Sequence, residues 1–154
     1  MDGDIAADHA RWWQDHGPAV VRYATLLVGP NDASDVTAIA FGKLTQAHRA
    51  AIDDVRSYWM RAVFTVAQDQ HRSRRRRQVR DLHAVLPAET VMPETELDIR
   101  RAVASLSVQQ RAVVYFTYWE DLDSAQIGTL LGIDAATVRR HLTRARSRLR
   151  KVLE

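Results

Sequence analysis

Apolar residues recur every three or four positions along most of this chain, a spacing that predicts helices rather than strands. No stretch alternates cleanly between apolar and polar residues, and no hairpin turn signal is present. The sequence therefore predicts an all-α fold. The first helix is expected over residues 17–29, with Pro18 in its first turn, where the missing N–H costs nothing. Gly29 followed by Pro30 is its expected stop.

Two further helices are predicted in the first half of the chain. The second begins after Asn31 or Asp32, either of which is available as its N-cap. The third runs from about Asp53 into an arginine-rich segment at residues 72–77. The apolar face of the third helix is expected to consist of Tyr58, Trp59, Val63, Val66 and Ala67.

The helical pattern breaks over residues 81–97. This segment contains Pro87 and Pro93, scattered acidic residues and no sustained period, which is typical of a linker. We therefore predict two small helical domains, at residues 1–80 and 98–154, joined by this short linker.

The last part of the chain predicts a helix-turn-helix. Asp123 and Gln126 have the spacing of a capping box at the start of a short apolar helix. Gly132 ends that helix in a left-handed conformation, and Asp134 caps a second helix. The second helix has basic outer positions, so its first turns are expected to enter the major groove of DNA. Its inner seam is expected to consist of Val138, Leu142, Ala145, Leu149 and Val152.

The distribution of charge adds a nucleic-acid partner to this picture. The net charge is only +3, yet residues 72–80 hold six arginines and residues 139–151 hold seven basic residues. Clustered arginine is the electrostatic footprint of nucleic-acid binding. The alternative is a pair of solvated helical faces, which fits less well because few acidic residues are interleaved with the basic ones.

The outer face of the last helix carries the side chains expected to read DNA. Arginine bonds guanine with two N–H groups, and threonine contacts a phosphate or a thymine methyl group. The predicted base-reading residues are Arg139, Arg140, Thr143 and Arg144. The basic residues assigned to phosphates are Arg146, Arg148, Arg150 and Lys151.

These residues belong to the stretch "LSVQQRAVVYFTYWEDLDSAQIGTLLGIDAATVRRHLTRARSRLRKVL", which resembles the C-terminal domain of bacterial sigma-70-type factors. Ser107 stands where proline is usual, Asp121 where glycine is, and Gln126 where glutamate is, and none of these removes the fold. In the family this domain binds the minus-35 promoter element. The resemblance implies minus-35 contacts by Thr137, Arg139, Arg140, Thr143, Arg144 and Arg148.

The first half is similar to the other conserved sigma domain, through "HGPAVVRYATLLVGPNDASDVTAIAF" and "YWMRAVFTVAQDQHRSRRRR". In the family the third helix and its basic tail recognise and melt the minus-10 element. The tryptophans are expected mostly as core or inter-helix anchors, and Trp59 or Tyr58 of the third helix is the candidate for a second role, stacking on an unpaired base. The implied minus-10 contacts are Tyr58, Trp59, Arg72, Arg74, Arg75, Arg76 and Arg77. Two such domains joined by a short linker, with no further domain between them, are typical of the extracytoplasmic-function class.

The second helix departs from the family at the positions that meet RNA polymerase. The family reads roughly Asp-Leu-Val-Gln-Glu-Ala-Phe there, and this chain keeps Asp35 but has Ala38 and Ile39 in place of the glutamine and glutamate. The resemblance implies polymerase contacts by these three residues. Two hypotheses follow: a sigma factor that binds core polymerase and directs promoter-specific initiation, or a sigma-like DNA-binding regulator whose polymerase contact is weakened or repurposed.

Other chemistry finds no support in the sequence. There is no cysteine, and the six histidines are widely spaced without a metal-binding pair, so neither a metal nor another cofactor is expected. No phosphate loop or nucleophile elbow indicates an enzyme. Residues 1–10 are acidic, unlike a signal peptide, and no apolar run approaches the roughly 20 residues of a membrane span. We therefore expect a cytoplasmic protein with core polymerase and promoter DNA as partners, and an anti-sigma factor as a further implied partner.

Overall fold

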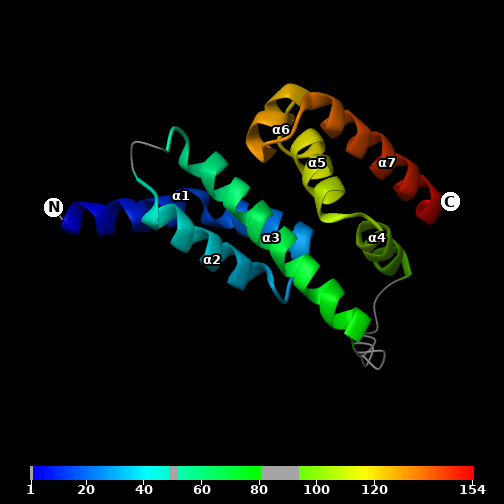
Figure 1. The fold of residues 1–154 in the computed structure, drawn as a ribbon, viewed down its shortest axis with the longest axis horizontal. Helices are drawn as coiled ribbons and strands as arrows, with labels where there is room; N and C mark the ends of the chain where they lie inside the picture. The colour runs from blue at the N-terminus through cyan, green and yellow to red at the C-terminus, as the bar shows by residue number, and fades with distance from the viewer. Residues whose placement is uncertain (1, 49–51, 81–93) are drawn as a thin grey trace.

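The structure is a computed structural model that describes residues 2–48, 52–80 and 94–154. Within these ranges the chain is helical and contains no strand, which confirms the all-α prediction. Figure 1 shows the helices in chain order. They are α1 (Asp2–Val28), α2 (Ala33–Gln46), α3 (Val55–Arg80), α4 (Glu94–Ala104), α5 (Val108–Tyr118), α6 (Ser124–Leu131) and α7 (Ala135–Leu153).

The start of α1 differs from the prediction. The helix already begins at Asp2, and Pro18 lies inside it rather than in its first turn. A proline inside a helix removes one backbone hydrogen bond, so the preceding turns need another source of stability. Aromatic packing supplies it, because the Trp13 ring centroid lies 5.1 Å from that of Phe41 and 5.3 Å from that of Trp59. The predicted stop is confirmed, since Gly29 has a φ of +86°.

Helices α1, α2 and α3 pack together around a fully buried core. Asp32 is the N-cap residue of α2 as predicted, but its side chain makes no capping hydrogen bond and instead accepts one from Arg74 on α3 at 2.5 Å. Trp59 of α3 donates its indole N–H to the carbonyl of Thr37 at 3.2 Å. The largest fully buried side chains here are Trp59, Tyr23, Leu27, Leu44, Met60, Val20, Val36 and Val63.

Local signals explain the helices of the second half. Ser107 and Gln110 form a capping box at the start of α5, and Asp123 and Gln126 form the predicted one at the start of α6. Gly132 ends α6 with a φ of +73°, as expected. The predicted inner seam of α7 is largely confirmed: Val138 and Ala145 are buried, and Leu142 and Leu149 are partly buried. Val152 does not belong to it, because it is exposed near the end of the helix.

The two helical halves are in direct contact. Helix α4 begins at Glu94, so the last residues of the predicted linker are helical, while residues 81–93 lie outside the described part of the chain. Helix α5 packs against α1 and α3, and α6 packs against α3. The Tyr23 ring centroid lies 5.0 Å from those of both Tyr115 and Phe116. In Figure 1 the N-terminal end of α1 extends away from the other helices, opposite the end that meets α5.

Candidate nucleic-acid interface

The outer face of α7 presents the predicted base-reading residues to solvent. Arg139, Arg140, Thr143 and Arg144 are all exposed, whereas Val138 is completely buried on the opposite side. The Thr143 hydroxyl donates to the backbone carbonyl of Arg139 at 3.0 Å, which leaves the oxygen lone pairs outward. The helix therefore offers three guanidinium groups on one accessible face.

The first turn of α7 is fixed by a double cap. The Asp134 carboxylate accepts hydrogen bonds from the backbone N–H and from the hydroxyl of Thr137, both at 2.8 Å. The hydrogen bond from the Thr137 hydroxyl, followed by the one from its backbone N–H, holds the pKa of Asp134 below its ordinary value. Since the Thr137 hydroxyl already donates to Asp134, it is left as an acceptor in this conformation. Its predicted DNA contact then requires a donor from the DNA or a bridging water.

Two of the later basic residues of α7 also contact the helices beneath it. Arg146 donates from Nε to the Tyr118 hydroxyl at 2.7 Å, and its guanidinium carbon lies 5.7 Å from the Tyr118 ring centroid. Arg148 donates to the carbonyl of Ser105 at 2.8 Å, near the end of α4. A guanidinium has five N–H donors, so each residue keeps donors for a phosphate while bracing α7.

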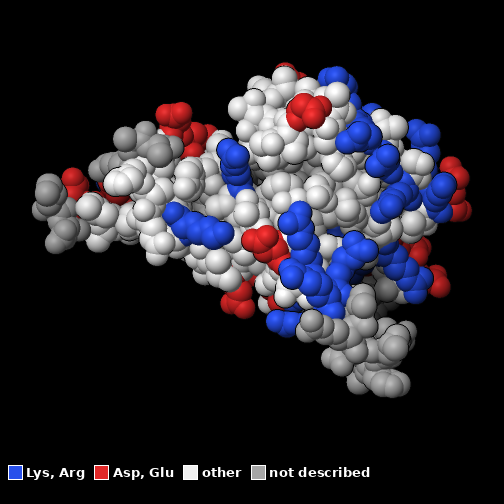
Figure 2. Space-filling model, in the orientation of Figure 1, with Lys and Arg blue, Asp and Glu red and all other residues white. Residues whose placement is uncertain are grey.

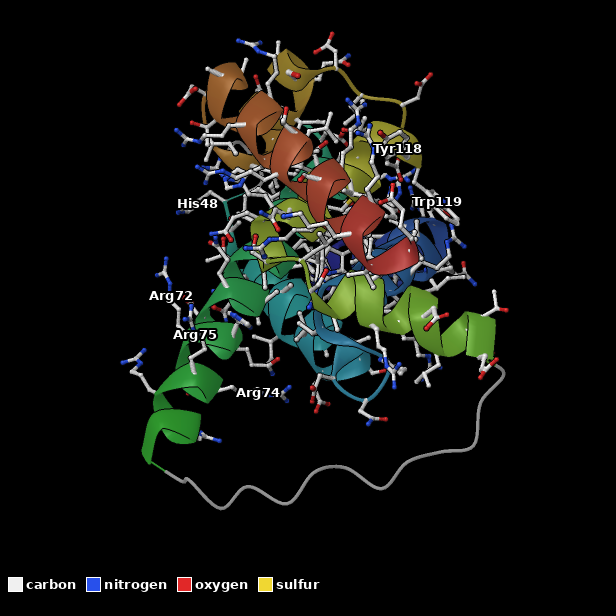
Figure 3. All side chains as sticks on the ribbon, turned by 90° about the vertical axis from the view of Figure 1, so that its right-hand side faces the viewer. His48, Arg72, Arg74, Arg75, Tyr118 and Trp119 are labelled. Carbon is white, nitrogen blue, oxygen red and sulfur yellow. The ribbon has the colours of Figure 1, made fainter. Side chains whose placement is uncertain are left out.

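The basic end of α3 is organised differently. Arg72, Arg75 and Arg77 are exposed and have no side-chain partner among the described residues, whereas Arg74 pairs with Asp32. Arg76 donates from Nε to the carbonyl of Arg72 at 3.5 Å, a long contact. Figure 3 shows Arg72, Arg74 and Arg75 projecting from the same end of α3.

The two basic regions share one face of the molecule. Figure 2 shows Lys and Arg side chains gathered over α7 and over the C-terminal part of α3, with few acidic side chains between them on that face. A surface of one sign attracts a polyanion and raises the rate at which it is encountered.

The prediction that Trp59 stacks on a base is wrong for this conformation. Its side chain has an exposed fraction of 0% and belongs to the core, which is the role expected for most of the tryptophans. Tyr58 is only partly buried and lines a groove of about 490 Å³ between α3 and the helix-turn-helix, together with Leu122 and Gln126. Of the two stacking candidates, Tyr58 is thus the accessible one, and it faces the other half of the molecule.

The predicted polymerase-binding residues lie together on the outer face of α2. Asp35, Ala38 and Ile39 are exposed, and Ile39 keeps 51% of its surface in contact with solvent. The opposite face is buried against α1 and α3, through Val36 and Ala40. An exposed isoleucine beside a carboxylate makes this face partly apolar, unlike the glutamine–glutamate pair of the family pattern.

Contacts between the two halves involve residues to which sequence reasoning assigned no role. Arg111 donates to the carbonyls of Leu27 at 2.7 Å, Val103 at 3.0 Å and Ala104 at 3.3 Å, so one side chain serves the ends of α1 and α4. Burial lowers the pKa of Arg111. The only advance signal was that Arg111 fits the sigma-type pattern, which gives no geometry.

A second contact joins α3 to the segment after α5. Arg56 forms an ion pair with Glu120, whose Oε1 also accepts the hydroxyl of Tyr115 at 3.0 Å. Burial, then the hydrogen bond to Glu120, raises the pKa of Tyr115 to about 12. Tyr115 therefore stays protonated and remains a donor to Glu120 over the whole neutral range.

The described residues provide neither a membrane-spanning helix nor a metal site. None of the described helices is long and apolar enough to cross a membrane. Residues 2–48, 52–80 and 94–154 contain no group of three or more His, Asp or Glu side chains placed to hold a metal ion.

Comparisons with known proteins agree with this arrangement. A family model described as sigma-70, region 4 matches residues 96–149. The RNA polymerase sigma-E factor of Streptomyces avermitilis is 31% identical over 156 residues, which cover 96% of this chain and 84% of that protein. The ECF RNA polymerase sigma factor SigL of Mycobacterium tuberculosis is 31% identical over 170 residues, covering 100% of this chain and 95% of SigL.

A solved structure shares the fold. The sigma factor RpoE from Bartonella quintana, crystallised in complex with the anti-sigma factor NepR, superimposes with a TM-score of 0.71. The match covers 95% of this chain and 96% of that one at 18% sequence identity. At this identity the likeness concerns the fold alone.

Proposed function

Because this chain belongs to the extracytoplasmic-function group of the sigma-70 family, we propose how its surfaces share the work of promoter recognition. The chain is a sigma factor that directs transcription initiation, with RNA polymerase and promoter DNA as partners. The alternative of a regulator without a productive polymerase contact is not favoured, since the relatives are named as polymerase sigma factors. We further propose that it acts in the cytoplasm and has no enzymatic activity of its own.

Helix α7 is the proposed reader of the minus-35 element. The observation that carries this assignment is the row of exposed arginines on a helix whose opposite face is buried at Val138 and Ala145. Arg139, Arg140 and Arg144 would contact base edges, with Thr143 beside them. Thr137 and Arg148 would fix the register of the helix on phosphates. Bidentate arginine contacts with guanine supply the largest share of base discrimination in such a face.

The C-terminal end of α3 is the proposed minus-10 surface. Arg72, Arg75 and Arg77 have no partner among the described residues, so they would be compensated by promoter phosphates. Arg74 and Arg76 lie in the same stretch of α3 and would add positive charge to this surface. Tyr58 is the proposed stacking residue, and because it lines the groove against α6, the two halves would have to move apart for a base to reach it.

The outer face of α2 is the proposed polymerase contact. Asp35 supplies a charged hydrogen-bond acceptor, typically worth 1.5–3 kcal/mol. Ile39 supplies an apolar contact of up to about 2 kcal/mol where the polymerase offers a matching pocket. Ala38 lies between them and leaves room for the partner.

Co-purification with core polymerase followed by run-off transcription tests this proposal. We expect the unaltered chain to bind core polymerase and start transcription from a cognate promoter. Asp35→Ala should abolish co-purification, while the double change Ala38→Gln with Ile39→Glu should bind equally or more tightly. Lys43→Gln, another exposed position of α2, serves as the matched control. Failure of the unaltered chain to bind core polymerase would instead support the regulator hypothesis.

A further inference from the structure

An apolar groove lies between the two halves, on a part of the molecule that the proposed promoter and polymerase surfaces do not use. Its volume is about 660 Å³, and it is formed by the end of α1, by α4 and by α5. Leu26, Val28 and Val103 contribute aliphatic walls. Ligand sites of small molecules usually have volumes of 300–1,000 Å³ and often lie at such junctions.

An aromatic platform forms one side of this groove. The Trp119 ring stacks on that of Tyr115, with ring centroids 6.2 Å apart and planes at 7°. Trp119 nevertheless leaves 70% of its surface exposed, and Ile99 on the facing helix leaves 53% exposed. Figure 3 shows Trp119 and Tyr118 on the opposite side of the view from the labelled arginines of α3. An exposed tryptophan beside an apolar groove indicates a surface that binds something.

The charged side chains that line the groove are all basic. Arg22, Arg100 and Arg111 line it, and no carboxylate does. The Arg111 guanidinium already donates to three backbone carbonyls. Arg100 forms one long ion pair with Glu96, at 3.8 Å. Arg22 has no hydrogen bond or ion pair with any described residue. A single cation without a partner therefore stands beside apolar walls.

We propose that this groove binds a small amphipathic anion, with an aliphatic or aromatic body and one acidic head group. The body would lie on Leu26, Val103 and the Trp119 ring, where its apolar surface is removed from water. The head would pair with Arg22, since a charge-assisted hydrogen bond from a guanidinium is about twice as strong as a neutral one.

The walls of the groove distinguish this ligand from a nucleic acid. A polynucleotide needs a track of several cations spaced along its backbone. In this groove Arg22 is the cation without a partner, and most of the lining is apolar. A ligand with one negative charge on an apolar body is therefore the better match.

Occupancy of the groove would link the two halves. The ligand would touch α1 of the first half and both α4 and α5 of the second. A ligand favours whichever arrangement it binds better, so this one stabilises the arrangement in which the halves are packed together. The groove shares no lining residue with the proposed promoter and polymerase surfaces, and its existence does not depend on the roles proposed above.

Titration of the full chain with decanoate tests the proposal, using displacement of the fluorescent aromatic sulfonate 1-anilinonaphthalene-8-sulfonate and isothermal calorimetry. We expect saturable binding of one decanoate per chain, and at least tenfold weaker binding of the uncharged decanol. Arg22→Gln should weaken decanoate binding by about tenfold, through loss of the head-group contact. Arg101→Gln is the matched control, because Arg101 is exposed on α4 but does not line the groove.

A second variant fills the groove without touching the core. Ala104 is exposed and lines the groove, so Ala104→Trp should abolish decanoate binding while circular dichroism and thermal unfolding stay unchanged. Equal binding by this variant, or no saturable binding by the unaltered chain, overturns the proposal. So does displacement of the sulfonate by an acidic amphipathic peptide but not by decanoate, which would make the groove a protein-docking surface.

Discussion

The arginines of α7 stand on a helix that is anchored from its first turn to Arg148, whereas those of α3 come after the last fully buried side chain that is described on that helix. Helix α7 is double-capped at Asp134, buried at Val138 and Ala145, and braced through Arg148 to the end of α4. Over residues 55–77 of α3, the last fully buried side chain is that of Ala67, before the arginine run begins. Reading base edges needs fixed geometry, while melting and holding a strand needs mainly charge, so the difference in support matches the two proposed tasks.

The largest expected effect comes from a glycine in the first helix of the helix-turn-helix. A Cβ on Gly128 would lie 2.5 Å from the carbonyl oxygen of Ile133, which real Cβ atoms do not tolerate. Gly128→Ala should therefore lower the free energy of unfolding by about 3 kcal/mol, as overpacked sites do. Gly42→Ala in α2 is the control, because a Cβ there meets nothing within 4 Å. Urea denaturation should find the control unchanged or slightly more stable, and equal effects of the two changes would contradict this packing.

Single arginine substitutions on the two surfaces should behave differently. Arg139→Ala should cost about 1–3 kcal/mol on the cognate minus-35 sequence and relax the preference at one base pair. Arg75→Ala should weaken binding of all sequences alike and reduce the slope of log affinity against log salt by about one unit. Fluorescence anisotropy on cognate and scrambled duplexes over a salt series measures both. Identical profiles for the two variants would remove the distinction between the surfaces.

A smaller effect is expected where a basic residue has both structural and phosphate contacts. Arg148→Ala loses the bond to Ser105, which should lower the free energy of unfolding by about 0.5–1 kcal/mol. Arg150→Ala should leave stability unchanged, since its side chain has no partner among the described residues. Both should reduce DNA affinity evenly across sequences. Chemical denaturation compared with DNA binding separates the two contributions, and equal stability of the variants would show that the Ser105 contact contributes nothing.

The smallest effect concerns the cap of α7, is present near neutral pH and disappears in acid. The pKa of Asp134 is lowered in the folded chain from its ordinary value of 3.8. Its contribution to stability is therefore complete above that value and is lost as the pH falls through the lower, folded pKa. Asp134→Ala should be less stable than the unaltered chain at pH 6, and the gap should close below pH 3.8. Thermal unfolding at a series of pH values checks this, and a gap independent of pH would contradict it.

Local signals predicted most of the fold, and long-range contacts account for what was missed. The capping box of Asp123 and Gln126 and the left-handed Gly132 depend on a few neighbouring residues, so they could be read directly. The early start of α1 could not, because the packing of Trp13 on Trp59 outweighs the local effect of Pro18. Local rules assign each element separately and do not see such packing.

The candidate site also contains features that local sequence predicted and features that depend on long-range contacts. The exposure of Arg139 and Ile39 followed from helical period, since each lies opposite a recognisable apolar stripe. The burial of Trp59 did not, because an aromatic residue on a helix suits a core and a stacking platform equally well. The contacts of Arg111 with Leu27 and of Arg56 with Glu120 span 84 and 64 positions, and nothing in the local sequence announces them.

The position of Arg111 gives the chain an order of assembly. When α1 leaves the ribosome, the carbonyl of Leu27 near its end is open to water, because the side chain that will bond it has not yet been synthesised. The aromatic packing of Trp13, Phe41 and Trp59 joins α1, α2 and α3 and can form first, whereas Tyr23 of α1 also packs on α5. The last turn of α1 gains its partner only when α5 forms, so the N-terminal half is completed by the half that is translated after it.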